Sequence, residues 1–382
     1  MHDSGRIREL DGLRGISIAL VLVFHYFVQH VETRPGSLAA YALKYLSLTW
    51  AGVDVFFVLS GFLLGGILLD QRGAENFFRV FYLRRALRIM PPYVFFLVLF
   101  AIALAMFPAA AHPGMGWLLD EPLPFWSYAL YLQNFFMAAE GRFGPNFGAP
   151  TWSLAVEEQF YLLFPLLIFW CPAQRLREVL ITLVCAAPVL RVALYVAVPE
   201  GALAGFVLLP SRWDSLLLGA LAAWSLRQDE TRTWIAAHAS TLKRAFIFAA
   251  AGIALSPFLG FSQLSFGMAI VGHVWIAGTV ALLLTLLTLH QLAGIARFLR
   301  LRPLCFLGRI SYSVYLLHQP VRGSLTALIF NSDPHIGSPA EFAVAVAAFV
   351  VTVLLATATW NGFEARMIRL GHAAQYKVSV SS

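Results

Sequence analysis

The stretch RELDGLRGISIALVLVFHYF (residues 8–27) decides the fold class, because a charged start leads into an apolar run of membrane-spanning length. Arg14 lies at its start and His25 lies deep inside it. Eleven residues of α-helix turn through about 1100°, which places both side chains on one face, about 16 Å apart along the axis. Ionisable groups inside an apolar span rarely face lipid, so the pair indicates a functional site. A boundary arginine with a satisfied interior histidine is the alternative.

The composition extends this prediction to the whole chain. Of 382 residues, 59% are hydrophobic and 12% are charged, whereas soluble domains carry about 25% charge. The mean hydropathy is +0.74. We predict an all-α polytopic membrane protein with ten spans. The predicted spans are residues 12–29, 52–69, 90–107, 152–170, 179–196, 211–226, 245–260, 267–289, 311–330 and 341–361.

The distribution of Lys and Arg predicts the orientation. With the N-terminus in the cytoplasm, the basic residues of the outer segments are Arg34, Lys44 and Arg142, and nearly all others lie inside. Both termini are therefore expected in the cytoplasm. The segment 125–138 is too short to cross and is expected to be interfacial or re-entrant. The first span has no cleavage site of a signal peptide.

Several function classes are disfavoured. Cys171, Cys185 and Cys305 are far apart and form no metal-spaced cluster, so no metal site is expected. The basic residues lie between apolar spans, which indicates contact with the lipid bilayer rather than with nucleic acid. Phosphate-binding loops and nucleophile elbows are absent from the sequence.

Three carboxylates near the outer ends of spans are candidates for chemistry. Asp54 begins the second span at a depth similar to that of His25, where it would orient the imidazole and strengthen it as a base. Alternatively, lipid headgroups solvate Asp54. Glu157 and Glu158 open the fourth span. Adjacent helical residues point about 100° apart, so one of them faces a cavity while the other caps the helix.

Other polar residues lie at or inside later spans. Arg84, Arg85 and Arg88 precede the third span, which Pro91 and Pro92 are expected to open. Clustered guanidiniums bind phosphates, although for these residues taken alone positive-inside anchoring is the favoured explanation.

The ninth span carries Tyr315 and His318 three residues apart, on one helix face. They either line a cavity or belong to the core, where the histidine donates to a carbonyl. Structural pairing is expected for Arg191, Arg212 and His273.

Five segments, taken in order, resemble the membrane-bound acyltransferase 3 family over nearly the whole chain. They are LDGLRGISIALVLVFHYF, GVDVFFVLSGFLL, YLRRALRIMPPY, TWSLAVEEQFYLLFP and LGRISYSVYLLHQP. The resemblance implies an acyltransferase for groups other than amino-acyl groups, located in the bacterial cytoplasmic (inner) membrane. It implies cytoplasmic acyl-CoA, most commonly acetyl-CoA, as co-substrate, with no permanently bound cofactor. The implied acceptor is a hydroxyl of exopolysaccharide, lipopolysaccharide or a lipid-linked sugar; some relatives acylate macrolides.

The resemblance also implies roles for residues of this chain. His25 is expected to be the general base, or alternatively to carry the acyl group itself. Asp54 is a possible orienting partner and Glu158 a further catalytic candidate. The residues expected to bind acyl-CoA are Arg14, Arg84, Arg85, Arg88, Tyr315 and His318.

Residues 1–371 are expected to form one membrane-embedded acyltransferase domain, and residues 372–382 a short cytoplasmic tail, without a C-terminal hydrolase-like domain. Pro150 and Thr151 stand where relatives often carry a histidine. The rival interpretation is a transporter or flippase, for which buried charges are also expected. Transporters often contain internal repeats, and the sequence shows none.

Overall fold

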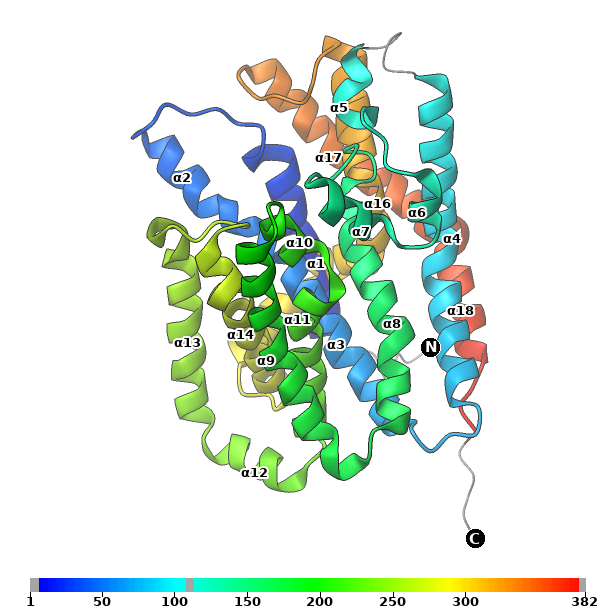
Figure 1. Ribbon diagram of the computed structural model, residues 1–382, viewed down its shortest axis with the longest axis vertical. Helices are drawn as coiled ribbons and strands as arrows, with labels where there is room; N and C mark the ends of the chain where they lie inside the picture. Colours follow the sequence, from blue (N-terminus) through cyan, green and yellow to red (C-terminus); the bar gives the residue numbers. More distant parts are fainter. Residues whose placement is uncertain (1–6, 108–112, 378–382) are drawn as a thin grey trace. The chain divides into compact units, whose positions relative to one another are not determined.

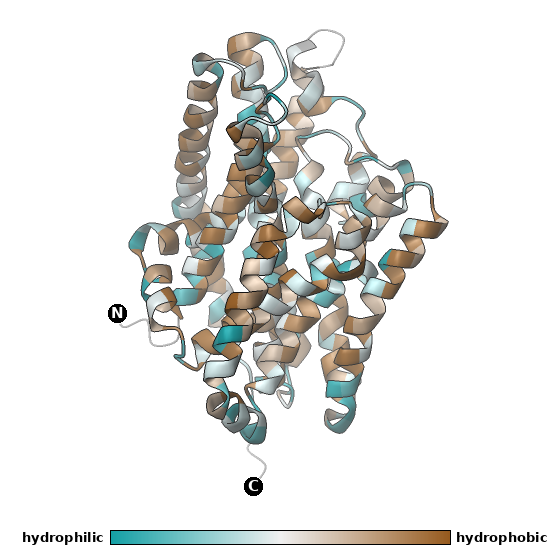
Figure 2. Ribbon diagram, turned by 90° about the vertical axis from the view of Figure 1, so that its left-hand side faces the viewer, coloured by the Kyte–Doolittle hydropathy of each residue, from teal (hydrophilic) through white to brown (hydrophobic). Residues whose placement is uncertain are grey.

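A computed structural model describes residues 7–107 and 113–377. Across these residues the chain is almost entirely helical, and an isolated parallel bridge joins Val31 and Ile336. The described residues contain nine helical segments that are long and apolar enough to cross a membrane. Figure 2 shows hydrophobic residues along the long helices and polar residues at loops and helix ends. The predicted all-α polytopic membrane fold is confirmed.

The predicted span that is missing from these nine segments is the ninth, residues 311–330. It lies in α16 (Arg302–Phe330), which is 29 residues long. At about 1.5 Å per residue this helix has the length to cross a bilayer. It is more polar than the nine segments, with His318 and Arg322 inside it. The segment predicted to be interfacial or re-entrant forms two short helices, α6 (Phe125–Ala129) and α7 (Gln133–Glu140), which are too short to cross.

The described chain divides into two compact units, and each is considered by itself. The first unit holds the described residues of Met1–Phe24, Thr33–Ile67 and Cys171–Ser311. The second unit holds those of His25–Glu32, Leu68–Trp170 and Tyr312–Ser382. Helices α3 (Gly52–Asp70) and α16 contribute residues to both units.

The other elements of the first unit are α1 (Arg8–Val23), α2 (Leu38–Leu46), the 3-10 turn η2 (Ser47–Ala51), α9 (Ala173–Ala197), α10 (Gly201–Val207), α11 (Leu209–Ser225), α12 (Asp229–Ala237), α13 (Ala239–Leu255), η5 (Ser256–Leu259), η6 (Met268–Gly272), α14 (His273–Thr288) and α15 (Ala293–Leu299). The second unit contains α4 (Phe77–Met106), η3 (Pro113–Met115), α5 (Gly116–Leu119), α6, α7, η4 (Ala149–Thr151), α8 (Trp152–Trp170), α17 (Pro339–Thr359), η7 (Trp360–Glu364) and α18 (Ala365–Ala373). The π-helical turn η1 (Phe24–Val28) follows α1 and begins at the boundary.

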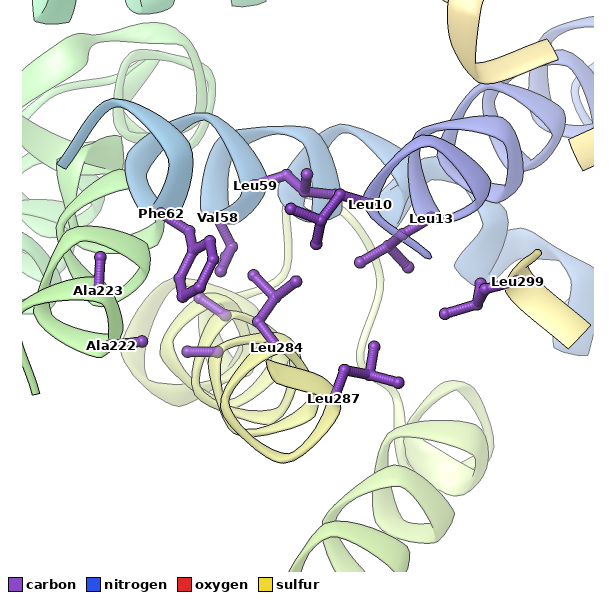
Figure 3. Packing of buried hydrophobic residues seen from close by; sticks show 12 residues of the cluster. Leu10, Leu13, Val58, Leu59, Phe62, Ala222, Ala223, Leu284, Leu287 and Leu299 are labelled. Carbon is purple, nitrogen blue, oxygen red and sulfur yellow. The ribbon is translucent and has the colours of Figure 1, made fainter. Parts of the chain in front are cut away.

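The core of the first unit is built from buried apolar side chains of five helices. Figure 3 shows Leu13 of α1, Phe62 of α3 and Leu284 of α14 within this cluster, together with residues of α11 and α15. The sequence places these side chains at helical spacing, so each helix presents an apolar stripe to its neighbours.

Helices α3 and α11 approach closely at two glycines. A Cβ on Gly61 would lie 1.7 Å from the carbonyl oxygen of Leu216, and one on Gly219 would lie 2.0 Å from that of Val58. Small residues let membrane helices bring their backbones together in this way.

We therefore expect Gly61→Ala to lower the free energy of unfolding by about 1–3 kcal/mol, because a backbone atom cannot move aside as a side chain can. The matched control is Gly278→Ala in α14, where an added Cβ meets nothing within 4 Å. Thermal unfolding in detergent measures both variants. Equal midpoints for the two would contradict the close contact.

In the second unit, α18 packs beside α4 (Figure 1). The chain beyond Ala373 then follows the start of α4, where Asn76 Nδ2 donates to the carbonyl of Gln375 at 2.9 Å. Of the predicted tail, residues 378–382 lie outside the described residues.

Candidate active site

His25 lies in a π-helical turn. Helix α1 ends at Val23, and η1 carries the chain through Phe24–Val28. Single π turns are rare and often mark functional sites. Arg14 belongs to the first unit and His25 to the second, so their alignment on one face stays a prediction.

The second unit brings together the two histidines singled out from the sequence. The rings of His25 and His318 lie with their centroids 4.9 Å apart in an edge-on arrangement. The Nδ1–H of His318 donates to the carbonyl oxygen of Tyr315 at 2.6 Å. In the neutral ring, Nε2 then carries the lone pair, and this buried atom has no hydrogen-bond partner among residues 7–107 and 113–377. His318 Nε2 can therefore accept a proton.

Tyrosines fix the position of this histidine pair. The Tyr26 hydroxyl lies 2.8 Å from the carbonyl oxygen of His318 and 2.7 Å from Thr352 Oγ1, which ties η1 to α16 and α17. The Tyr315 hydroxyl donates to the carbonyl of Pro150 at 2.7 Å and lies 2.6 Å from Ser153 Oγ. Tyr315 thus links α16 to the start of α8, a positioning contact that the sequence did not indicate.

Glu158 lies near Arg85. The Arg85 guanidinium stands over the Tyr161 ring, 5.5 Å from its centroid, and interacts electrostatically with Glu157 and Glu158. Tyr93 is also within electrostatic range of the half-buried Glu158. The expectation that Glu158 and Arg85 lie at opposite membrane faces is therefore wrong.

The reason is the length of α4. The third span was expected to begin at residue 90, after the arginines, with Pro91 and Pro92 opening it. Instead, α4 starts at Phe77 and continues through both prolines, as membrane helices can when their surroundings satisfy the freed backbone groups. Arg85 consequently lies inside the helix rather than before it.

The three clustered arginines have different surroundings. Arg84 donates through Nε and Nη2 to the carbonyl of Ala374, at 3.0 and 2.7 Å, and stacks on Tyr376. Arg88 interacts electrostatically with Glu364. Arg85 and Arg88 lie within electrostatic range of each other, as their spacing predicts. The contacts of Arg84 with the chain after α18 could not be read from the sequence.

Asp54 belongs to a buried ionic network in the first unit. Its Oδ1 accepts from Arg212 Nη2 at 2.6 Å and from Ser215 Oγ at 3.2 Å, and it lies 3.7 Å from His273 Nδ1. Asp54 is 0% exposed, so its interpretation as a headgroup-solvated carboxylate is wrong. The alternative role as the partner of His25 stays a prediction and now competes with this ion pair.

A second buried pair completes the network. Arg191 Nη2 donates to Asp214 Oδ2 at 2.7 Å, and Arg191 Nε donates to the carbonyl of Ala269 at 2.8 Å. Arg212 also contacts His273 Nδ1. The structural pairing expected for these residues is observed.

Arg14 contacts Asp11, with 3.4 Å between Nη1 and Oδ1, and its side chain is 21% exposed. In the part of the chain that the structure describes, no three His, Cys, Asp or Glu side chains are grouped as a metal site would require. Sequence reasoning gave no role to Arg322, although it follows His318 by one helical turn.

Comparison with known proteins identifies relatives over this same region. Residues 7–361 match the sequence model of the acyltransferase 3 family, which is described as "Acyltransferase domain". The chain is 24% identical over 400 residues to the "O-acetyltransferase OatA" of Staphylococcus aureus, covering 98% of this chain and 59% of that protein. It is 28% identical over 359 residues to the "Peptidoglycan O-acetyltransferase OatA" of Listeria monocytogenes, covering 86% of this chain and 51% of that protein. The chain thus spans little more than half the length of these relatives. No solved structure matches it.

Proposed function

Because this chain belongs to the acyltransferase 3 family, we propose that it is an O-acetyltransferase of the bacterial cytoplasmic membrane. It moves an acetyl group from cytoplasmic acetyl-CoA to a hydroxyl of a cell-envelope sugar. The names of its relatives support an acceptor of the peptidoglycan type. The nine apolar helices in the described residues support a membrane location.

The observation that carries the proposal is the histidine pair of the second unit. An imidazole can take a proton at neutral pH. His25 and His318 lie 4.9 Å apart between ring centroids, and His318 is held in one tautomer by its bond to Tyr315. Two adjacent imidazoles inside a helical membrane unit fit proton transfer better than they fit apolar packing.

In the proposed reaction, His25 removes the proton of the acceptor hydroxyl as its oxygen attacks the acetyl carbon. A new C–O bond forms, the C–S bond breaks, and the CoA thiolate leaves. The thiolate then takes the proton from His25, so the enzyme returns to its starting state. In the alternative route, His25 attacks the thioester first and passes the acetyl group to the hydroxyl afterwards.

Arg85 and Arg88 of the second unit are proposed to bind the phosphates of acetyl-CoA. We expect Arg85→Ala to weaken acetyl-CoA binding roughly tenfold or more, because charge-assisted hydrogen bonds contribute about 1.5–3 kcal/mol each. Calorimetry with acetyl-CoA measures the effect, with Arg79→Ala on the exposed face of α4 as the control. Wild-type affinity in Arg85→Ala and Arg88→Ala would exclude this role.

Mass spectrometry of envelope glycans tests the function as a whole. Cells that produce the chain are expected to carry O-acetyl groups, each adding the mass of one acetyl substituent, that are lost when the chain is removed. Restoring the wild-type chain should restore them. Identical glycan spectra in both cell types would contradict the proposal.

A further inference from the structure

Arg322 is a buried cation whose hydrogen bonds are incomplete. It is 0% exposed, and Nη1 donates to Thr326 Oγ1 at 2.6 Å. Nε and Nη2 have no hydrogen-bond partner within the described parts of the chain. Burying unpaired donors of a charged group is strongly unfavourable, so this guanidinium needs a further hydrogen-bond acceptor that the described residues do not supply.

The unpaired edge has a specific shape. Nε and Nη2 direct two parallel N–H groups to one side of the planar guanidinium, and this edge matches the two oxygens of a carboxylate or phosphate. A neutral hydroxyl would satisfy one of the donors and leave the other unpaired. The geometry therefore favours an acidic group over a neutral one.

The neighbouring carboxylate of the protein is already engaged. Glu341 interacts electrostatically with Arg322. Its Oε2, however, accepts from the backbone N–H groups of Gly337 and Ser338, both at 2.8 Å, and closes the capping box of α17. The edge of Arg322 is thus left for a ligand.

Arg322 lies beside the histidine pair. It follows His318 by four residues of α16, which places the two side chains on one face about 6 Å apart along the axis. Two more buried polar atoms near this face have no partner among the described residues, Gln319 Oε1 and His30 Nε2. His30 lies beyond the end of the first span, where burial above all lowers its pKa to about 4, so it is neutral at pH 7.

We propose that the Nε–Nη2 edge of Arg322 binds an acidic group of the acceptor sugar and so places a sugar hydroxyl beside His25 and His318. This inference rests on the proposed function for the identity of the acceptor. In the predicted orientation α16 runs from the cytoplasmic side outwards, so Arg322 lies on the outer side of His318. Because acetyl-CoA enters from the cytoplasm, we assign Arg322 to binding of the acceptor rather than of the donor.

Binding of matched sugars to the purified full chain in nanodiscs tests the proposal. N-acetylmuramic acid is compared with its methyl ester, and N-acetylglucosamine 1-phosphate with N-acetylglucosamine, by calorimetry. We expect the wild type to bind the acidic member of at least one pair roughly tenfold more tightly. The pair that shows the preference tells whether carboxylate or phosphate is the ligand.

Variants separate Arg322 from other sources of this preference. Arg322→Gln should abolish the preference, Arg322→Lys should keep part of it, and Arg232→Gln on exposed α12 should keep all of it. Acetyl-CoA affinity should stay unchanged in each variant. If Arg322→Gln does not fold, the wild type and Arg322→Lys still provide the comparison.

Three results would overturn the proposal. The first is equal binding of the acidic and neutral members of both pairs by the wild type, as expected if ordered water alone completed the hydrogen bonds of Arg322. The second is that Arg322→Gln keeps the preference, and the third is that Arg322→Gln weakens acetyl-CoA binding, which would assign the edge to the donor. All three are distinct from failure of the proposed function, which would appear as unaltered glycan acetylation in cells lacking the chain.

Discussion

His25→Ala is expected to slow acetyl transfer by about 10²–10⁴-fold, the contribution of a positioned general base. A sugar hydroxyl is a weak nucleophile at neutral pH, so the reaction depends on removal of its proton as the C–O bond forms. The His25 ring is the group that meets His318 in the second unit. Turnover of labelled acetyl-CoA by purified protein measures the effect.

The control is His290→Ala, which removes an exposed imidazole from the first unit and should leave turnover unchanged. The thermal midpoint and acetyl-CoA affinity of His25→Ala should also remain near those of the wild type. Near-normal turnover in this variant would exclude His25 as the base. An acetyl-histidine adduct trapped without acceptor would replace direct attack by the two-step route.

Arg212→Ala is expected to lower the free energy of unfolding by about 3–5 kcal/mol, because it leaves the Asp54 carboxylate buried without its partner. Both side chains are 0% exposed and lie 2.6 Å apart between Nη2 and Oδ1. Chemical denaturation of the purified protein measures the loss. A loss below about 1 kcal/mol, typical of an exposed pair, would contradict the burial of this network.

A double replacement distinguishes a structural role of Asp54 from a role in catalysis. Asp54→Leu combined with Arg212→Met should recover much of the stability lost in Arg212→Ala, since apolar replacement of a buried ion pair is often neutral or stabilising. If Asp54 serves only this pair, the double variant retains acetyl transfer. A stable but inactive double variant would instead support the predicted orienting role of Asp54 toward His25.

The fold class was predictable because apolar runs of membrane-spanning length leave few alternatives. The helix boundaries were less predictable. Pro91 and Pro92 indicate a helix start, yet α4 passes through both prolines. Arg85 therefore lies within the helix, near Glu158. The predicted span in the polar helix α16 begins at residue 311, whereas the helix itself begins at Arg302.

Local spacing predicted some site geometry and missed the rest. Tyr315 and His318 lie close together on α16, as their i, i+3 spacing predicts. The hydrogen bond that fixes the His318 tautomer is the local contact expected of a core histidine. The partner of Asp54 lies 158 residues away in sequence, so no local pattern could indicate Arg212. The incomplete hydrogen bonds of Arg322 likewise depend on which side chains the fold brings near it.

Transfer of a ¹³C-labelled acetyl group by the purified chain in nanodiscs tests the central claim most directly. Acetyl-CoA labelled in the acetyl group is supplied with a peptidoglycan-type sugar acceptor, and the products are analysed by mass spectrometry. We predict labelled O-acetyl sugar and free CoA in equal amounts, with both lost in His25→Ala. Movement of the sugar across the bilayer with no labelled product, as expected of a transporter, would contradict the account.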